Sequence, residues 1–128
     1  MSVVSIDPRD ATPIYAQLER GLRAAIATGR LHPGDQLPTV RQLAVELKVN
    51  ANTVARVYGE LERAGVLETR RGVGSFVSAE GQSEARSAGE KAKRLRAFVT
   101  RVIGDAAAAG FSIDDVAAEM RAHRQKGA

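Results

Sequence analysis

One stretch of this sequence, residues 39–74, gathers side chains that could recognise nucleic acid. An arginine guanidinium can form two parallel hydrogen bonds to guanine or hold a phosphate, and an asparagine amide can bridge the N6 and N7 atoms of adenine. Glycines beside such groups let a backbone approach a ligand closely. The candidate DNA-binding residues in this stretch are Thr39, Arg41, Asn50, Asn52, Thr53, Arg56, Arg70, Arg71, Gly72 and Gly74.

The leading candidates for reading bases stand near two predicted helix starts. Arg41 and Arg56 are each expected to face the groove with a guanidinium that can form a fork to the O6 and N7 atoms of guanine. Asn52 is expected to bridge adenine, and Thr53 to reach a base edge or a thymine methyl group.

Other candidates are expected to hold the sugar–phosphate backbone. Thr39 and Asn50 stand where free amides at helix N-termini help to bind anions. Arg70 and Arg71 can enter a minor groove or hold phosphates, and the adjacent glycines allow close approach. Structural alternatives stay open, because an exposed arginine can be a solvated charge and Asn50 can be a helix cap alone. For Tyr58 we favour core packing over base stacking.

The spacing of apolar residues around these candidates predicts two helices joined by a tight turn. Thr39 and Gln42 have the spacing of a capping box, which marks the start of the first helix. Asn50 can cap the second helix, over about residues 51–64, and Gly65 can end it. The residues expected to be buried on these helices are Val40, Leu43, Ala44, Leu47, Val54, Val57, Tyr58 and Leu61.

Two short β-prone runs, residues 66–70 and 75–77, follow the second helix and are joined by a turn with two glycines. They predict a hairpin wing over about residues 66–77. Two helices at a sharp angle followed by a hairpin form a winged helix-turn-helix, in which the second helix enters the major groove. The predicted fold class is mainly α with a small β-hairpin wing, comprising an N-terminal winged helix-turn-helix and a short C-terminal two-helix dimerisation region.

The residues before this motif predict one further helix. Thr12 is expected to cap it with Pro13 in its first position, and Gly29 to end it. Residues 3–6 could add a small strand, and part of residues 30–36 could pair with the wing as a third short strand.

The C-terminal residues predict a helical hairpin behind a linker. Residues 79–89 are rich in small and polar types, as in linkers; one amphipathic helix then ends near Gly110, and Ser112 starts another that frays from His123. Two such helices cannot enclose a core, so they pack on the first domain, on another copy, or on both. We favour a two-fold dimer, because it would present two recognition helices about 34 Å apart. The expected dimer contacts are Leu95, Phe98, Val99, Val102, Ile103, Phe111, Val116 and Met120.

Composition narrows the function classes without naming one. The net charge of +4 permits a polyanionic partner, but residues 1–78 carry ten Lys and Arg against eight Asp and Glu, so arrangement matters more than balance. The chain has no cysteine, which excludes disulfides and thiolate sites. We find no Ser/His/Asp grouping and no phosphate loop, and neither His32 nor His123 has a second ligand at metal spacing. We therefore expect no enzyme activity, no metal and no cofactor.

The distribution of apolar residues predicts a chain that does not enter a membrane. No apolar run approaches the length of a membrane span, and the N-terminus lacks a charged-then-apolar leader. We expect a cytoplasmic location.

Four blocks of residues follow one another in a specific order over about residues 10–78. They are Pro13-Ile14-Tyr15-x-Gln17-Leu18; Ile26-x-x-Gly29-x-Leu31-x-Pro33-Gly34-Asp35-x-Leu37-Pro38-Thr39-x-Arg41-x-Leu43-Ala44; Val49-Asn50-x-Asn52-Thr53-Val54-x-Arg56-x-Tyr58-x-x-Leu61-x-x-x-Gly65; and Gly72-x-Gly74-x-Phe76-Val77. This series resembles the N-terminal domain of the GntR family of bacterial transcription regulators. The short helical C-terminal part is similar to the YtrA-like branch of that family.

The resemblance implies a homodimer, usually a repressor, on a palindromic operator. The DNA-contacting arginine of the family falls on Arg41, and its wing glycine on Gly72 or Gly74. Its polar recognition-helix residues fall on Asn52, Thr53 and Arg56.

These observations predict three segments: a DNA-binding domain at 1–78, a linker at 79–89 and a dimerisation hairpin at 90–128. The first hypothesis for function is a homodimeric, sequence-specific repressor that binds double-stranded DNA. A second is a winged helix used as a protein-interaction module without a DNA role. A third adds a small-molecule effector, held between the domains or between the paired C-terminal helices.

Overall fold

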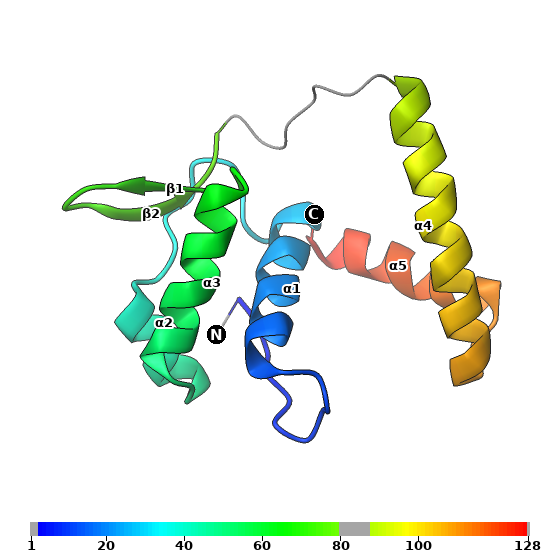
Figure 1. Cartoon of the computed structure of the whole chain (residues 1–128), viewed down its shortest axis with the longest axis horizontal. Helices are drawn as coiled ribbons and strands as arrows, with labels where there is room; N and C mark the ends of the chain where they lie inside the picture. The colour runs from blue at the N-terminus through cyan, green and yellow to red at the C-terminus, as the bar shows by residue number, and fades with distance from the viewer. Residues whose placement is uncertain (1–2, 80–87, 128) are drawn as a thin grey trace. The chain divides into compact units, whose positions relative to one another are not determined.

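The computed structural model describes residues 3–79 and 88–127, which form two compact units (Figure 1). The first unit contains α1 (Ile14–Ala27), α2 (Val40–Leu47), α3 (Ala51–Arg63), β1 (Leu67–Arg70) and β2 (Gly74–Val77). The second contains α4 (Ala88–Ala109) and α5 (Ile113–Gly127). The predicted fold class, a winged helix-turn-helix followed by C-terminal helices, is confirmed. Most of the predicted linker, residues 80–87, lies outside the described residues.

Helix α1 begins one residue later than predicted. Pro13 is its N-cap, in an extended conformation with ψ of 148°, and no side chain caps the helix. The carbonyl of Pro13 accepts hydrogen bonds from the amides of Ala16 and Gln17, so the first helical turn closes on the proline itself. The prediction that Thr12 caps this helix is therefore wrong. Gly29, with φ of +84°, follows the end of the helix as expected.

Residues 3–13 form an arm before α1 that contains neither helix nor strand, so the strand suggested at residues 3–6 is not formed. The side-chain amide of Gln17 binds this arm instead: its oxygen accepts from Asp7 N at 2.8 Å, and its nitrogen donates to the carbonyls of Asp7 and Thr12 at 3.0 and 2.9 Å. Val4 is buried against α1 at Gly21, where an added Cβ would lie 2.5 Å from Val4 Cγ1. A glycine at this position is what allows the arm to pack on the helix.

The helix-turn-helix forms as its local signals predict. The Thr39 hydroxyl accepts from Gln42 N at 3.0 Å while Gln42 Oε1 accepts from Thr39 N at 2.9 Å, which is a complete capping box. Lys48 makes the turn with φ of +59°, and among the described residues it is the one non-glycine with a positive φ. The apolar face of α3 is buried at all four predicted positions: Val54, Val57, Tyr58 and Leu61.

The wing is an antiparallel hairpin in which Leu67 pairs with Val77 and Arg70 with Gly74. The third strand suggested from residues 30–36 is reduced to one isolated bridge, between Gln36 and Phe76. Hydrogen bonds on either side of this bridge, such as Val77 N to the Asp35 carbonyl at 2.8 Å, tie the loop before α2 to β2.

The second unit is a hairpin of two helices. Gly110, with φ of +90°, ends α4, and Ser112 caps α5 through its hydroxyl, which accepts from Asp115 N at 3.0 Å. Helix α5 continues past His123, where the sequence predicts fraying, to Gly127. None of the helices in the described parts of the chain has the length and apolar character needed to cross a bilayer.

Candidate nucleic-acid interface

The outward face of α3 is the central feature of the candidate interface. Helix α3 lies between α1 and α2 and contacts both, as well as β1 (Figure 1). Because successive residues turn by about 100°, the four buried positions leave an opposite face for Asn52, Arg56 and Arg63. All three are exposed. The core thus holds α3 by one side and presents polar side chains on the other.

The start of α3 is capped by Asn50, whose Oδ1 accepts from Asn52 N at 2.7 Å. This use of its oxygen agrees with the cap role. The Asn52 side chain has no hydrogen-bond partner within the residues that the structure describes, so its amide is available to a ligand. Thr53 is half-buried and shares the lining of a crevice with Asn50 and Ile14.

The start of α2 offers one free cation. Arg41 is exposed in the first turn of α2 and forms no ion pair with any described residue. The Thr39 hydroxyl oxygen accepts from Gln42 N in the capping box, and its proton can still be donated to a phosphate oxygen.

Arg56 is held on two sides by its own unit. Its guanidinium carbon lies 4.0 Å from the centroid of the Tyr15 ring on α1, and its Nε lies 3.3 Å from Glu60 Oε2 one turn along α3. The side chain nevertheless stays 55% exposed. Arg56 is therefore an oriented guanidinium rather than a freely solvated charge.

The wing carries a second oriented arginine and a free one. Arg70 stacks on the Phe76 ring across the hairpin, with 4.3 Å between the guanidinium carbon and the ring centroid. Arg71 is exposed at the turn, beside Gly72 with φ of +77°. At Gly74, φ is +140° and an added Cβ would lie 2.7 Å from the side-chain nitrogen of Gln36, so only glycine fits there without movement.

Tyr58 belongs to the core, as predicted, and not to the exposed face. It is 6% exposed, and its hydroxyl donates a 2.7 Å hydrogen bond to the Pro38 carbonyl, which ties α3 to the chain before α2. Burial, reinforced by the Glu46 carboxylate, raises the pKa of Tyr58 from 10.0 to about 12.

The first unit thus carries the predicted DNA-binding residues on three of its elements: the start of α2, the start and outer face of α3, and the wing turn. Sequence reasoning missed the partners of these residues, namely Tyr15, Glu60 and Gln36. The spacing of four between Arg56 and Glu60 was a usable signal, because such residues are neighbours on a helix. Tyr15 and Gln36 reach the site only through the tertiary fold.

The second unit exposes most of the apolar side chains predicted to form a dimer contact. Leu95, Phe98 and Val99 on α4 are 57%, 51% and 42% exposed, and Phe111 is 58% exposed between the helices. Sequence reasoning missed Ile113, which is 61% exposed at the start of α5. A narrow apolar crevice between the helices is lined by Phe98, Val99, Val102, Ile103, Ala106, Ile113, Val116, Ala117 and Met120.

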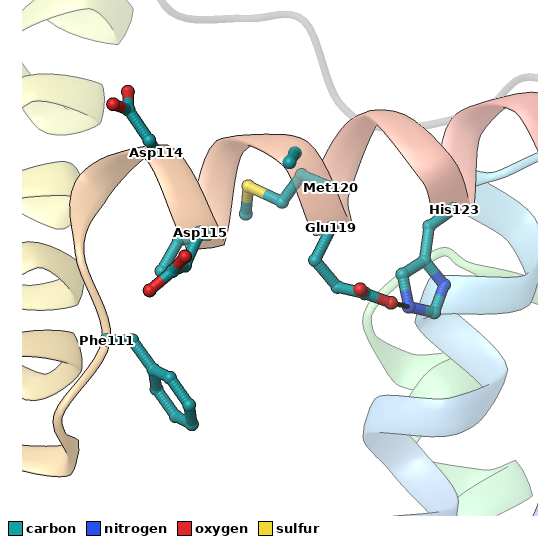
Figure 2. A pocket seen from close by; sticks show the side chains of 8 residues that line it. Phe111, Asp114, Asp115, Glu119, Met120 and His123 are labelled. Carbon is teal, nitrogen blue, oxygen red and sulfur yellow. Dashed lines mark ion pairs between the residues drawn. The ribbon is translucent and has the colours of Figure 1, made fainter.

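An open hollow on α5 has a mixed lining (Figure 2). Asp115 and Glu119 lie on the same side of the helix as the Phe111 ring, and Asp114 points away from them. Glu119 Oε2 lies 3.5 Å from His123 Nε2. Across residues 3–79 and 88–127, no three metal-ligating side chains gather closely enough to hold an ion.

Comparison with known proteins gives a family for this chain. The profile described as "Bacterial regulatory proteins, gntR family" matches residues 14–77, half of the chain. The HTH-type transcriptional repressor YtrA of Bacillus subtilis is 46% identical over 76 residues, which cover 59% of this chain and 58% of that protein. The match therefore spans little more than half of the relative.

Solved structures agree with the profile. YtrA from Sulfolobus acidocaldarius, described as a GntR-family transcription factor, is 33% identical with a TM-score of 0.59 and covers 80% of this chain and 99% of its own. The DNA-binding domain of AraR in complex with operator ORE1 is 27% identical with a TM-score of 0.51, over 59% of this chain and 92% of its own. The named relatives are regulators rather than enzymes, and two carry the YtrA name, which confirms the predicted resemblance. This chain belongs to the gntR family of bacterial regulatory proteins.

Proposed function

We propose that this chain is a sequence-specific DNA-binding transcription repressor that reads its operator with α3. The observation that carries the proposal is the two-sided character of α3, with Val54 and Leu61 completely buried and Asn52 and Arg56 exposed opposite them. A helix held in this way can enter a major groove without losing its packing. Support comes from a similar protein named a repressor and from the AraR domain described in complex with its operator.

In the proposed complex the three elements have different tasks. Asn52 and Arg56 read base edges, with Thr53 beside them at the start of α3. Arg41 binds a phosphate near the start of α2, and Arg71 binds one beside the wing. The two arginines that contact phosphates set affinity and register, whereas the residues of α3 set sequence preference.

We propose that the active species is a homodimer on a palindromic operator. The second unit supports this, because its exposed apolar side chains would be covered by the same face of another copy. On a palindromic operator, two copies of α3 would bind half-sites about one turn of DNA apart. In this proposal residues 1–78 form the DNA-binding domain and residues 90–128 the dimerisation hairpin.

The test is selection of bound duplexes from a random pool by the purified chain. We expect enrichment of an inverted repeat, bound with an affinity that falls steeply as salt rises. Arg56→Ala in the same selection is expected to lose preference at one base position in each half-site and to weaken binding by about 1–3 kcal/mol.

Two outcomes would oppose the proposal. If no sequence is enriched over the starting pool, the chain is not a sequence-specific DNA-binding protein, and the protein-interaction hypothesis gains. If the enriched sequence lacks two-fold symmetry and sedimentation finds a single copy, the dimer is excluded while DNA reading stands.

A further inference from the structure

Arg56 is the one candidate base-reading side chain whose direction is set by other residues of the fold. Its guanidinium lies against the Tyr15 ring at 4.0 Å and is bound at Nε by Glu60 at 3.3 Å. We propose that Tyr15 and Glu60 are positioning residues for DNA reading, which aim Arg56 so that it meets a guanine with both terminal nitrogens. This inference rests on the proposed function and adds a specificity determinant on α1, outside the helix-turn-helix.

The Tyr15 ring, on which the Arg56 guanidinium stacks, is held in place by the core. Tyr15 is half-buried and packs against the hydrophobic core of the first unit, where α1 contacts α3. Its ring is therefore held by the same packing that holds the recognition helix. A cation over an aromatic face at an exposed site gains a contact that corresponds to about a two- to fivefold preference for that position.

The bond to Glu60 determines which guanidinium nitrogens of Arg56 can bind a base. An arginine can grip the O6 and N7 atoms of guanine through its two terminal nitrogens or through Nε and one terminal nitrogen. Glu60 occupies Nε, and among the described residues the Arg56 guanidinium has no second hydrogen-bond partner, so both terminal nitrogens are available. Arg56 can therefore bind guanine through its two terminal nitrogens, but not through Nε and one terminal nitrogen.

The Arg56–Glu60 ion pair also changes the electrostatics of the interface. The Glu60 carboxylate offsets the charge of Arg56 and would repel nearby phosphates, so the pair gains less from a non-specific backbone contact than a free arginine does. A directed pair of hydrogen bonds to a base is affected less. Glu60 is therefore expected to raise discrimination between sequences at some cost in overall affinity.

The chain contains a matched control pair on α1. Arg23 Nε lies 3.3 Å from Glu19 Oε2, with the same spacing of four residues as Arg56 and Glu60. The side-chain exposures are also similar, at 43% and 31% for the α1 pair against 55% and 33% for the α3 pair. Arg23 has no aromatic partner among the described residues. Glu19→Gln thus removes an equivalent ion pair and leaves Tyr15, Arg56 and Glu60 unchanged.

The experiment measures binding to two duplexes with the full-length chain. One is the sequence selected by the wild type from a random pool, and the other carries a substitution at the base position where Arg56→Ala loses preference. Discrimination is the ratio of the two dissociation constants. The variants are Tyr15→Leu, Tyr15→Phe, Glu60→Gln and Glu19→Gln, each also combined with Arg56→Ala, and a melting curve checks that each folds.

We expect Tyr15→Leu to reduce discrimination about two- to fivefold, while Tyr15→Phe keeps it because the aromatic face remains. Glu60→Gln is expected to tighten binding to the substituted duplex and to lower discrimination, and Glu19→Gln to leave the ratio unchanged. When Arg56 is already alanine, the changes at Tyr15 and Glu60 should have no further effect on the ratio.

Two results would overturn the inference and spare the proposed function. One is a loss of discrimination in Tyr15→Leu that persists in the Arg56→Ala background, because the ring would then act on the fold and not on Arg56. The other is an enriched operator at which Arg56→Ala loses a base preference while Tyr15→Leu and Glu60→Gln leave the ratio unchanged, because Arg56 would then read the base without being positioned by either residue. If the wild type enriches no duplex at all, the proposed function fails and this inference falls with it.

Discussion

Replacement of Tyr58 by phenylalanine tests how α3 is tied to the chain before α2. The hydroxyl of Tyr58 donates a 2.7 Å hydrogen bond to the Pro38 carbonyl from a side chain that is only 6% exposed. Loss of one such bond, with a carbonyl left partly unsatisfied, costs about 1–2 kcal/mol. We therefore expect Tyr58→Phe to be less stable than the wild type by this amount at neutral pH.

The pH dependence gives the sharper result. Burial, with the Glu46 carboxylate second, raises the pKa of Tyr58 in the folded state from 10.0 to about 12. The unfolded chain therefore releases this proton first, so the contribution of Tyr58 is complete below pH 10 and is lost as the pH rises to about 12. Each pKa unit is worth about 1.4 kcal/mol, so the wild type loses about 2–3 kcal/mol over this range that Tyr58→Phe does not lose.

The two free energies of unfolding are thus expected to cross between pH 10 and pH 12. Urea unfolding followed by circular dichroism, at one protein concentration and a series of pH values, measures the difference. Tyr15→Phe is the control, because Tyr58 is then the only tyrosine and its ionisation can be read directly from ultraviolet absorbance. A constant gap between wild type and Tyr58→Phe across this range would refute the reasoning.

Further predictions concern the turns, the wing and the second unit. Lys48→Gly should raise the free energy of unfolding by about 1 kcal/mol, because Lys48 holds φ of +59° and glycine removes that strain; an unchanged urea midpoint would contradict this. Gly74→Ala should lower stability by about 1–3 kcal/mol, more than Gly72→Ala, because φ of +140° at position 74 lies far from the left-handed α region and φ of +77° at position 72 lies near it. An added Cβ at position 74 would also displace the Gln36 side-chain amide, which donates to the Val73 carbonyl; equal losses would contradict this prediction. Arg71→Ala should weaken binding to all duplexes and reduce the salt slope by about 1, as measured by titration at several salt concentrations. Leu95→Asp should shift sedimentation from two copies to one, because Leu95 is 57% exposed on α4 and its burial against another copy would leave the aspartate without water; a dimer that survives would place the contact elsewhere.

Much of the first unit could be predicted from sequence because its signals are local. The capping box at Thr39, the cap at Asn50 and the glycine after α3 act within one helical turn, and each forms as expected. The apolar spacing of α3 likewise gave its buried face, including Tyr58. These features depend on neighbours a few residues away, which a sequence displays directly.

One error was local, because Pro13 and not Thr12 takes the N-cap position of α1. The other differences occurred where distant parts of the chain decide the outcome. The strand suggested at residues 3–6 does not form; Val4 packs on α1 at Gly21 instead, and the Gln17 side chain binds the arm at Asp7 and Thr12. Of the two partners of Arg56, only Glu60 could be predicted, because it lies one turn away on the same helix. Tyr15 lies on α1 and is brought next to Arg56 by the packing of α1 against α3. A residue type and its position on a helix predict that it is exposed, but not which neighbour will orient it.

The gap that Gly21 leaves on α1 limits how the first unit could be moved into another protein. Glycine within a helix costs about 1 kcal/mol relative to alanine, and here the space it leaves is filled by Val4 from the arm. A chimaera that began at Ile14 would keep the unfavourable residue and lose the side chain that occupies the gap. A chimaera that joins the first unit to another domain therefore needs the arm before α1 as well. A fusion partner added before the arm must leave Val4 free to pack against Gly21.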